Sequence, residues 1–387
     1  MLKSKSVIYV NFVQYDNTGR ILDFLKDNFF IVLHFSYDHL RLKRGRQTSY
    51  LRIFKKGKLI KEIKLVRLRM PQAFLFPSLP LVAIFMITQT IWYTFRFKRK
   101  YKSIDYYLTL NAFNAWIGNV LRFMGLVDKT IFWVGDYFPV IYRDWRIKLA
   151  RWVYWKFDKP SMQNADKLIF TNRRLANLYK RIKILPKNKK IYVVPIGTKT
   201  RFYKIKRENC IIGFLGMIKE SQGLELILDT LPILSKRLPT LKLEIVGSGP
   251  EEGRYQKRAE KFKKIIRFYG FIENQDKIHK IVSRWKIGLA PYQPVKSNES
   301  YWGDPSKIKV YLSAGVPVLT TNVSYMAGEI KKEKAGIIIA YNKENDYINA
   351  IYKILTKIEL YRKNALNLSL KYDYKKNYPK IFEGLEK

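Results

Sequence analysis

Four glycine-containing turns in the second half of the chain could bind a phosphorylated ligand. The first lies in residues 211–224, where Gly216 follows a strand-like run and a helix begins near Gly223. A glycine lets the backbone approach a ligand closely, and a helix N-terminus attracts an anion. Lys219 is the cation in this turn. Gly216 and Lys219 are therefore candidate phosphate ligands, although an ordinary turn between a strand and a helix shows the same pattern.

Two further turns follow at similar intervals. Residues 243–250 form a strand-like run that ends in a Gly-x-Gly-Pro loop at Gly247 and Gly249. Residues 265–272 form another such run, with Gly270 and Phe271 at its end, and its backbone could contact a flat ring. Each turn alone is a weak signal, because many loops between strands and helices contain glycine.

The fourth turn lies in residues 304–318. Pro305 and Ser306 suit the first positions of a helix, where unpaired backbone N–H groups point outward, and Gly315 suits its C-terminal end. Lys307 is therefore a candidate ligand for a diphosphate. The alternative is a solvated lysine on a helix. Four turns of this kind in this order are far more specific than any one of them.

Alternating strands and helices must position these turns. Strand-like apolar runs are predicted at 7–12, 30–35, 106–110, 130–134, 168–170, 192–194, 210–215, 241–246, 265–269, 287–290, 318–320 and 336–339. Helical segments lie between them, for example 18–27, 111–124 and 145–158. This alternation is typical of parallel sheets covered on both faces.

The pattern runs twice, with a Pro/Gly hinge at 195–197. We therefore predict an α/β protein of two Rossmann-like doubly wound domains that face each other across a cleft. Residues 1–195 would form the first domain and residues 196–371 the second. Ligands would bind at the carboxyl ends of the strands, in the cleft.

Composition excludes several classes of function. The chain has 387 residues and one cysteine, which excludes a disulfide scaffold and a zinc-ribbon site. Its three histidines, His34, His39 and His279, lie far apart in the sequence, so neither a multi-histidine metal centre nor a Ser/His/Asp triad is expected. Hydrophobic residues make up 47%, enough for full cores rather than long disordered tails.

The chain is strongly basic, with 74 Lys and Arg against 31 Asp and Glu and a net charge of +43. Such an excess implies an anionic partner. Between Arg41 and Arg69 basic and apolar residues alternate, which predicts strands or a hairpin with a basic face. That face is either a solvated edge or a surface that meets phosphates of a lipid or substrate.

An uncharged stretch at residues 73–95 follows this basic segment. It is long enough to span a bilayer, but Pro77 and Pro80 shorten the expected helix to 81–95, so we reject a membrane span. Two interpretations remain: a buried core helix, or a helix at the membrane interface, as Trp92, Tyr93 and the basic residues 96–100 suggest. Residues 1–6 lead directly into a strand-like run, so no secretory signal is expected.

Together the four turns resemble the retaining nucleotide-sugar glycosyltransferases of the GT-B fold, in particular family 4 (glycosyl transferases group 1). The resemblance covers residues 191–340 most clearly. It implies transfer of a hexose-type sugar, without a metal, from a UDP- or GDP-linked donor to a glycan or lipid-linked acceptor. The donor would bind the second domain and the acceptor the first. A C-terminal helix within 372–387 would cross back to the first domain.

The resemblance also assigns residues, with some departures. The donor would contact Gly216, Lys219, Gly247, Gly249, Gly270, Phe271, Pro305, Ser306 and Lys307, with Lys307 and Asp136 as catalytic residues. Asp136 would hold an acceptor hydroxyl, or else would cap the following turn. The family's diphosphate-binding arginine and lysine are replaced by Met217 and Gln222, and its paired glutamates by Trp302 and Val310. Glu299 is a candidate substitute for the first glutamate, although its spacing differs.

The basic first half and the apolar helix suit an enzyme of polysaccharide or glycolipid synthesis. Such an enzyme would be cytoplasmic and peripheral on the inner face of the cell membrane. Two alternatives remain: a relative that binds nucleotide sugars but has lost its catalytic glutamates, and a nucleic-acid-binding protein. The second explains the charge but leaves the four turns unexplained, so we expect no nucleic-acid partner.

Overall fold

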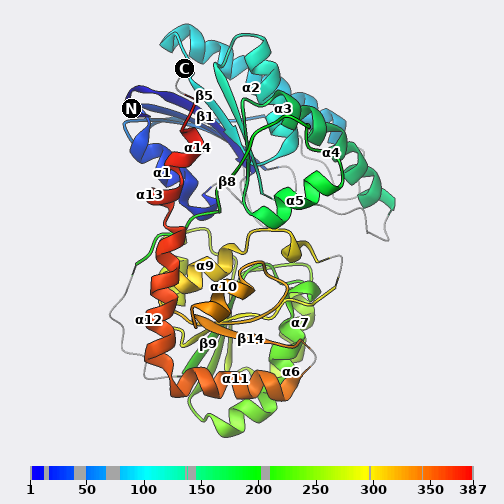
Figure 1. Ribbon diagram of the computed structural model, residues 1–387, viewed down its shortest axis with the longest axis vertical. Helices are drawn as coiled ribbons and strands as arrows, with labels where there is room; N and C mark the ends of the chain where they lie inside the picture. The colour runs from blue at the N-terminus through cyan, green and yellow to red at the C-terminus, as the bar shows by residue number, and fades with distance from the viewer. Residues whose placement is uncertain are drawn as a thin grey trace. The chain divides into compact units, whose positions relative to one another are not determined.

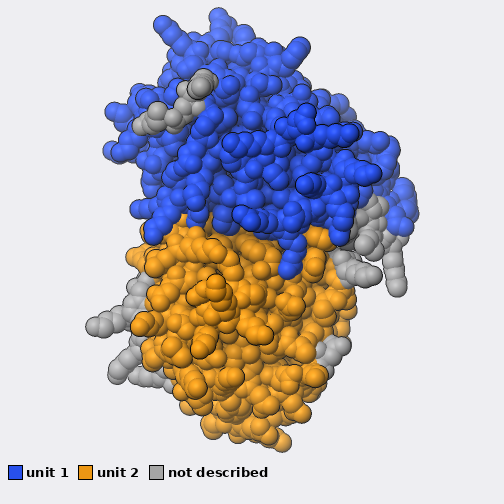
Figure 2. Space-filling model, viewed as in Figure 1, with its two compact units in different colours: residues 1–195, 374–387 blue, residues 196–373 orange. Residues whose placement is uncertain are grey.

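The computed structural model describes residues 2–12, 17–38, 49–66, 79–135, 137, 145–201, 210–295, 298–341 and 343–385. It divides the chain into two compact units (Figures 1 and 2). Unit 1 contains residues 1–195 and 374–387, and unit 2 contains residues 196–373. The C-terminal segment of the chain, residues 374–387, thus belongs to unit 1 together with the N-terminal half.

Unit 1 is built on an eight-stranded sheet with the order β4-β3-β2-β1-β5-β6-β7-β8. All neighbouring strands are parallel except β2–β3 and β3–β4, which form an antiparallel edge. The strands are β1 (Ser6–Phe12), β2 (Ile31–Tyr37), β3 (Tyr50–Lys55), β4 (Lys58–Lys64), β5 (Tyr106–Thr109), β6 (Lys129–Val134), β7 (Lys167–Phe170) and β8 (Ile191–Val193). The hairpin predicted within the basic segment is therefore β3–β4, although residues 41–48 and 67–69 lie outside the described residues.

The helices of unit 1 are α1 (Ile21–Asn28), α2 (Leu79–Tyr101), α3 (Ala112–Phe123), α4 (Trp145–Asn164), α5 (Arg173–Arg181), α13 (Tyr374–Asn377) and α14 (Pro379–Phe382). Crossover connections between parallel strands are right-handed, so α2, α3, α4 and α5 cover one face of the sheet and α1 covers the other. The C-terminal segment with α13 and α14 lies beside α1 (Figure 1). There Phe382 packs its ring against the rings of Phe24 and Phe29.

Unit 2 has an entirely parallel sheet with the order β11-β10-β9-β12-β13-β14. The strands are β9 (Cys210–Leu215), β10 (Leu241–Val246), β11 (Ile266–Gly270), β12 (Ile287–Ala290), β13 (Val318–Thr321) and β14 (Gly336–Ile339). The helices are α6 (Leu224–Arg237), α7 (Glu252–Ala259), α8 (Gln275–Val282), α9 (Ser306–Ser313), α10 (Ala327–Lys332), α11 (Glu344–Thr356) and α12 (Ile358–Ser369). The predicted α/β class with parallel sheets and two domains is confirmed.

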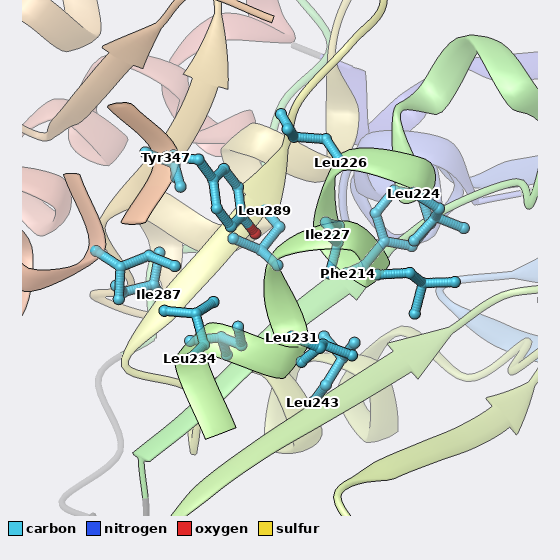
Figure 3. Packing of buried hydrophobic residues seen from close by; sticks show 14 of the residues in the cluster. Phe214, Leu224, Leu226, Ile227, Leu231, Leu234, Leu243, Ile287, Leu289 and Tyr347 are labelled. Carbon is cyan, nitrogen blue, oxygen red and sulfur yellow. The ribbon is translucent and has the colours of Figure 1, made fainter. Parts of the chain in front are cut away.

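Apolar burial holds the elements of unit 2 in place. One core joins Phe214 on β9, Leu243 on β10 and Leu289 on β12. The same core includes Leu231 of α6 and Tyr347 of α11 (Figure 3). Continuous burial on both faces is typical of central strands of a parallel sheet, and all four residues of β12 are buried.

Side-chain caps fix where several helices begin. Asn111 caps α3 by accepting the backbone N–H groups of Phe113 and Asn114, and Asn172 caps α5 by accepting that of Leu175. Asparagine is a preferred N-cap residue because its side-chain oxygen pairs a backbone donor that has no partner inside the helix. These local signals explain why α3 begins within one residue of its predicted start.

Candidate functional site

The order in which successive strands are added to the sheet of unit 2 reverses between β9 and β12. The chain builds β9, β10 and β11 outward on one side, and then β12, β13 and β14 on the other. Loops that leave adjacent strands at such a point diverge to opposite faces and leave a crevice at the carboxyl ends, where open α/β sheets bind ligands. The loops after β9 and β12 are the segments that carry Lys219 and lead to Lys307.

Lys307 extends from the first turn of α9 toward these strand ends. Its ammonium donates to the side-chain oxygen of Gln222 at 2.6 Å and lies 4.1 Å from the ring centre of Phe214 and 5.1 Å from that of Tyr292. Burial lowers the pKa of this ammonium well below its usual value, and the positive charge of Lys219 lowers it further. Lys307 is thus directed into the site rather than into bulk water.

Gly216 leaves room for the Lys307 side chain. A Cβ at this position would lie 3.0 Å from both the Cε and the Nζ of Lys307, and the residue adopts φ +137°, which side chains disfavour. Backbone and ammonium therefore meet closely at the end of β9. This contact joins the first and fourth turns of the sequence pattern.

Gly247 and Gly249 allow the second turn to pack on the first. A Cβ on Gly247 would lie 1.9 Å from the carbonyl oxygen of Gly216, and one on Gly249 would lie 2.2 Å from that of Ile218. The backbone N–H of Ile218 also donates to the carbonyl of Ser248 at 3.0 Å. Packing of the two turns therefore requires glycine at positions 247 and 249. The sequence pattern suggests a second requirement, the close approach of a ligand to the backbone.

The third turn continues this arrangement. The N–H of Gly247 donates to the carbonyl of Gly270 at 2.8 Å, so the ends of β10 and β11 are joined. Gly270 has φ +66°, and beyond its chain neighbours no heavy atom lies within 4 Å of the place that a Cβ would take. Phe271 is 43% exposed. These two residues present an open backbone and an exposed ring at the strand end.

Lys219 approaches Lys307 from the other loop. Its ammonium lies 3.0 Å from a carboxylate oxygen of Glu299, and the amide nitrogen of Gln222 donates to the hydroxyl of Ser300 at 3.1 Å. The structure therefore joins the two lysines through Gln222, Ser300 and Glu299. Sequence reasoning treated Gln222 only as a missing lysine, and no sequence signal pointed to Ser300.

A buried ion pair between Asp304 and Lys309 holds the start of α9 in place. Asp304 precedes Pro305 and Ser306, and its carboxylate pairs with Lys309, with both side chains fully buried. The same carboxylate accepts from the N–H of Ile196 at 2.6 Å, and Lys309 donates to the carbonyl of Ile196 at 2.8 Å. Ser306 itself is exposed at the helix N-terminus. The helix end is therefore held firmly and open to a ligand.

Three other expectations concern single positions. Asp136 lies outside the described residues, so nothing is added to its prediction. Tryptophan and valine stand at positions 302 and 310, so neither position supplies a carboxylate. Trp302 instead packs edge-on against Tyr301 with ring centres 4.7 Å apart, and Val310 lies on α9. Within the described ranges, no three His, Cys, Asp or Glu side chains gather as a metal ion would require.

Comparison with known proteins relates part of the chain to a family. Residues 209–357 match the family Glycosyl transferases group 1, which confirms the resemblance noted in the sequence. No curated protein sequence matches the chain.

Several solved structures share the fold of the whole chain. Sucrose-phosphate synthase from Thermosynechococcus elongatus aligns with a TM-score of 0.69 at 16% identity, over 98% of this chain and 97% of its own. Anabaena HepE in complex with UDP-glucose aligns with a TM-score of 0.67 at 11% identity, over 99% of both chains. The pneumococcal O-GlcNAc transferase GtfA, in complex with UDP and GlcNAc, aligns with a TM-score of 0.57 at 14% identity, over 93% of this chain and 71% of its own.

Proposed function

We propose that this chain, a glycosyltransferase of the GT-B type, transfers a hexose-type sugar from a UDP- or GDP-linked donor to a glycan or lipid-linked acceptor, with retention at the anomeric carbon. One observation carries the proposal: Lys219 and Lys307 converge from separate loops on the glycine turn at Gly216 and the start of α9. Two cations, a helix N-terminus and a close backbone match the charge and size of a diphosphate.

The chemistry requires positive charge at this position. Sugar transfer breaks the bond between the anomeric carbon and the diphosphate oxygen, so negative charge grows on the diphosphate as the ring becomes oxocarbenium-like. Lys219, Lys307 and the α9 N-terminus would stabilise that charge where it develops. In this proposal the lysines neutralise the leaving group without a metal ion. The backbone at Gly247, Gly249 and Gly270, with Phe271, would contact the nucleoside.

We propose that the Glu299 carboxylate contacts the sugar once a donor is bound. Its carboxylate lies 3.0 Å from the Lys219 ammonium, and a bound diphosphate would compete for that ammonium. The displaced carboxylate would remain beside the donor, where it could accept a hydrogen bond from a sugar hydroxyl. Glu299 would thereby take part of the role of the carboxylates that Trp302 and Val310 lack.

The acceptor is proposed to bind unit 1, with Asp136 holding its hydroxyl. Residues 1–200 contain 39 Lys and Arg against 11 Asp and Glu, a balance suited to an anionic or lipid-linked acceptor. We place the reaction in the cytoplasm at the inner face of the cell membrane, in polysaccharide or glycolipid synthesis. No described helix is long and apolar enough to cross a membrane.

A thermal-shift panel tests the donor site. UDP, GDP, ADP and their sugars are each added to the full-length protein, and one nucleotide is expected to raise its melting temperature selectively, because a ligand that binds only the folded state stabilises it. Lys307→Ala should abolish this rise, whereas Lys332→Ala, on the exposed end of α10, should retain it. Donor turnover by Lys307→Ala above about a tenth of the wild-type rate would remove the catalytic role of Lys307.

The loss of carboxylates at Trp302 and Val310 favours one second candidate, a protein that binds nucleotide sugars without transferring them. The same panel separates the two. A selective thermal shift together with transfer or slow hydrolysis of the matching sugar donor supports the enzyme. A selective shift without turnover of the donor, with any lipid or glycan acceptor, supports the binding protein.

A further inference from the structure

Three helices of unit 1 form one continuous layer. Helix α3 lies against both α2 and α4, so the three are neighbours in the order α2, α3, α4 over the same face of the sheet (Figure 1). The outer surface of this layer points away from the sheet. We call it the α2–α4 face.

Helix α2 turns its large apolar side chains outward. Leu81, Ile84, Trp92 and Phe95 are each between 45% and 57% exposed, and their spacing of three, eight and three residues places them along one side of a helix. The buried side contains Met86 and Phe97 as well as Thr90, whose hydroxyl lies 2.7 Å from that of Tyr37. Helix α2 is therefore apolar on both sides, whereas a helix that faces water normally has a polar outer side.

Helix α4 repeats this arrangement. Trp145, Leu149, Trp152 and Val153 are between 44% and 66% exposed, again with the spacing of one helix side. Exposed lysines alternate with them, and the Lys156 ammonium lies 4.6 Å from the ring centre of Trp152.

The C-terminal end of α3 adds two side chains to the same layer. Phe123 is 93% exposed and Met124 is 52% exposed. A soluble surface rarely carries so many large apolar groups in one layer without a partner that covers them.

The charge of the layer identifies the partner. Four Lys or Arg residues lie on α2, one on α3 and five on α4. The three helices contain a single acid, Asp158, and it is only 2% exposed. Arg96 and Arg99 lie 5.9 and 5.8 Å from the rings of Trp92 and Phe95, so cations adjoin exposed apolar groups at the C-terminal end of α2. A second copy of this face would repel it, whereas an anionic bilayer complements it.

We infer that the α2–α4 face docks on an anionic lipid bilayer, with α2 and α4 lying in the plane of the interface. Tryptophan and leucine side chains would enter the headgroup region while lysine and arginine contact lipid phosphates, as interfacial helices do. The inference rests on the proposed function in one respect, since it names the surface that brings a lipid-linked acceptor to the enzyme. The docking itself requires no sugar transfer.

Vesicle flotation tests the inference with the full-length protein. Vesicles of phosphatidylcholine alone are compared with vesicles containing about 30% phosphatidylglycerol, each at low and high salt. The wild-type protein is expected to float with the anionic vesicles at low salt. Ile84→Ser with Trp92→Ser on α2, and separately Leu149→Ser with Trp152→Ser on α4, should each weaken binding at least about tenfold. Leu360→Ser, at a 49% exposed leucine of α12, is the matched control and should bind as the wild type does.

Each other outcome overturns the inference. Absence of flotation with anionic vesicles would exclude the bilayer as partner. Binding that survives both serine pairs would show that charge alone acts, without the apolar face. Self-association that both pairs abolish, without flotation, would identify a second copy of the chain as the occupant. Thermal shifts with the nucleotide panel, measured on the same samples, separate failure of docking from failure of the donor site and show that the variants are folded.

Discussion

The ammonium of Lys307 donates a 2.6 Å hydrogen bond to the side-chain oxygen of Gln222, a residue 85 positions earlier in the chain. The family resemblance places a diphosphate-binding lysine at position 222. The structure instead brings a lysine to the same place from α9. A lysine ammonium from α9 therefore lies beside Gln222, at the position where the resemblance implies a diphosphate-binding lysine.

Lys307 should take up a proton when the donor binds. Its pKa is lowered in the free protein by burial and by Lys219, and an anionic diphosphate would raise it again. Above about pH 8, where the phosphates are already ionised, calorimetry of nucleotide binding in buffers of different ionisation enthalpy should therefore show net proton uptake. Lys307→Met should bind about tenfold to a hundredfold more weakly, the equivalent of about 1.5–3 kcal/mol for a hydrogen bond to a charged group. Uptake that persists unchanged in Lys307→Met would assign the proton to another group.

The buried Asp304–Lys309 ion pair should contribute to the stability of unit 2. Both side chains are fully buried and both bind the backbone of Ile196. Removing one partner leaves a buried charge uncompensated, so Lys309→Met should lower the free energy of unfolding of unit 2 by about 3–5 kcal/mol. The double variant with Asp304→Asn should recover a large part of that loss. Urea denaturation of the three proteins measures this, and strictly additive effects would contradict the coupling.

Gly247 should not tolerate a side chain. Its Cβ would meet the Gly216 carbonyl oxygen at 1.9 Å and its φ is +137°, so Gly247→Ala should destabilise unit 2 by about 3 kcal/mol or more. Gly253→Ala is the matched control, because this position lies in α7 with nothing within 4 Å of its Cβ. That change should stabilise the protein by about 0.5–1 kcal/mol. Equal melting temperatures for the two variants would contradict the packing of the second turn on the first.

The sequence predicted the turns but not their partners. Glycine at the end of an apolar run is a local signal, and it correctly located the ends of β9, β10 and β11, whereas Pro305 and Ser306 located the start of α9. The Lys219–Glu299 and Gln222–Ser300 contacts join residues 80 and 78 positions apart. No local pattern specifies such contacts, because they depend on the strand order that brings the loops after β9 and β12 together.

Helix α4 shows a second limit of local signals. The sequence predicted a helix ending at residue 158, before Pro160, whereas α4 continues to Asn164. Proline removes one backbone donor, but burial of Ser161 and Met162 stabilises the last turn, and Asn164 donates its side chain to the carbonyl of Pro160. Tertiary packing thus outweighs the helix-breaking tendency of one residue.

Phe382 should be essential for the stability of unit 1. It is 1% exposed, and its ring centre lies 4.9 Å from that of Phe29 and 5.4 Å from that of Tyr106. Phe382→Ala should therefore lower the free energy of unfolding of unit 1 by about 3–5 kcal/mol, as is usual for truncation of a buried phenylalanine. Leu370→Ala, at a 47% exposed leucine, should change stability by less than about 0.5 kcal/mol. Chemical denaturation measures both, and a Phe382→Ala protein as stable as the wild type would show that the C-terminal segment adds little to unit 1.

Asp158 should make the stability of unit 1 depend on pH. Burial raises its pKa from 3.8 to about 7, and the hydroxyl of Tyr179, 3.3 Å away, offsets this only in part. The folded protein therefore holds this proton more tightly than the unfolded chain does. The contribution of Asp158 to the free energy of unfolding is full below about pH 4 and falls as the pH rises to about 7, by up to about 4 kcal/mol at about 1.36 kcal/mol per pKa unit.

Asp158→Asn tests this sign directly. Asparagine resembles the protonated acid and can still accept from Tyr179, so the variant should match the wild type near pH 4 and exceed it at pH 8. The difference in free energy of unfolding between variant and wild type, measured by denaturation at several pH values, should grow between about pH 4 and pH 7 and then level off. A difference that shrinks with rising pH would mean that the ionised carboxylate stabilises α4, and that the single acid of the α2–α4 layer is held there as a charge.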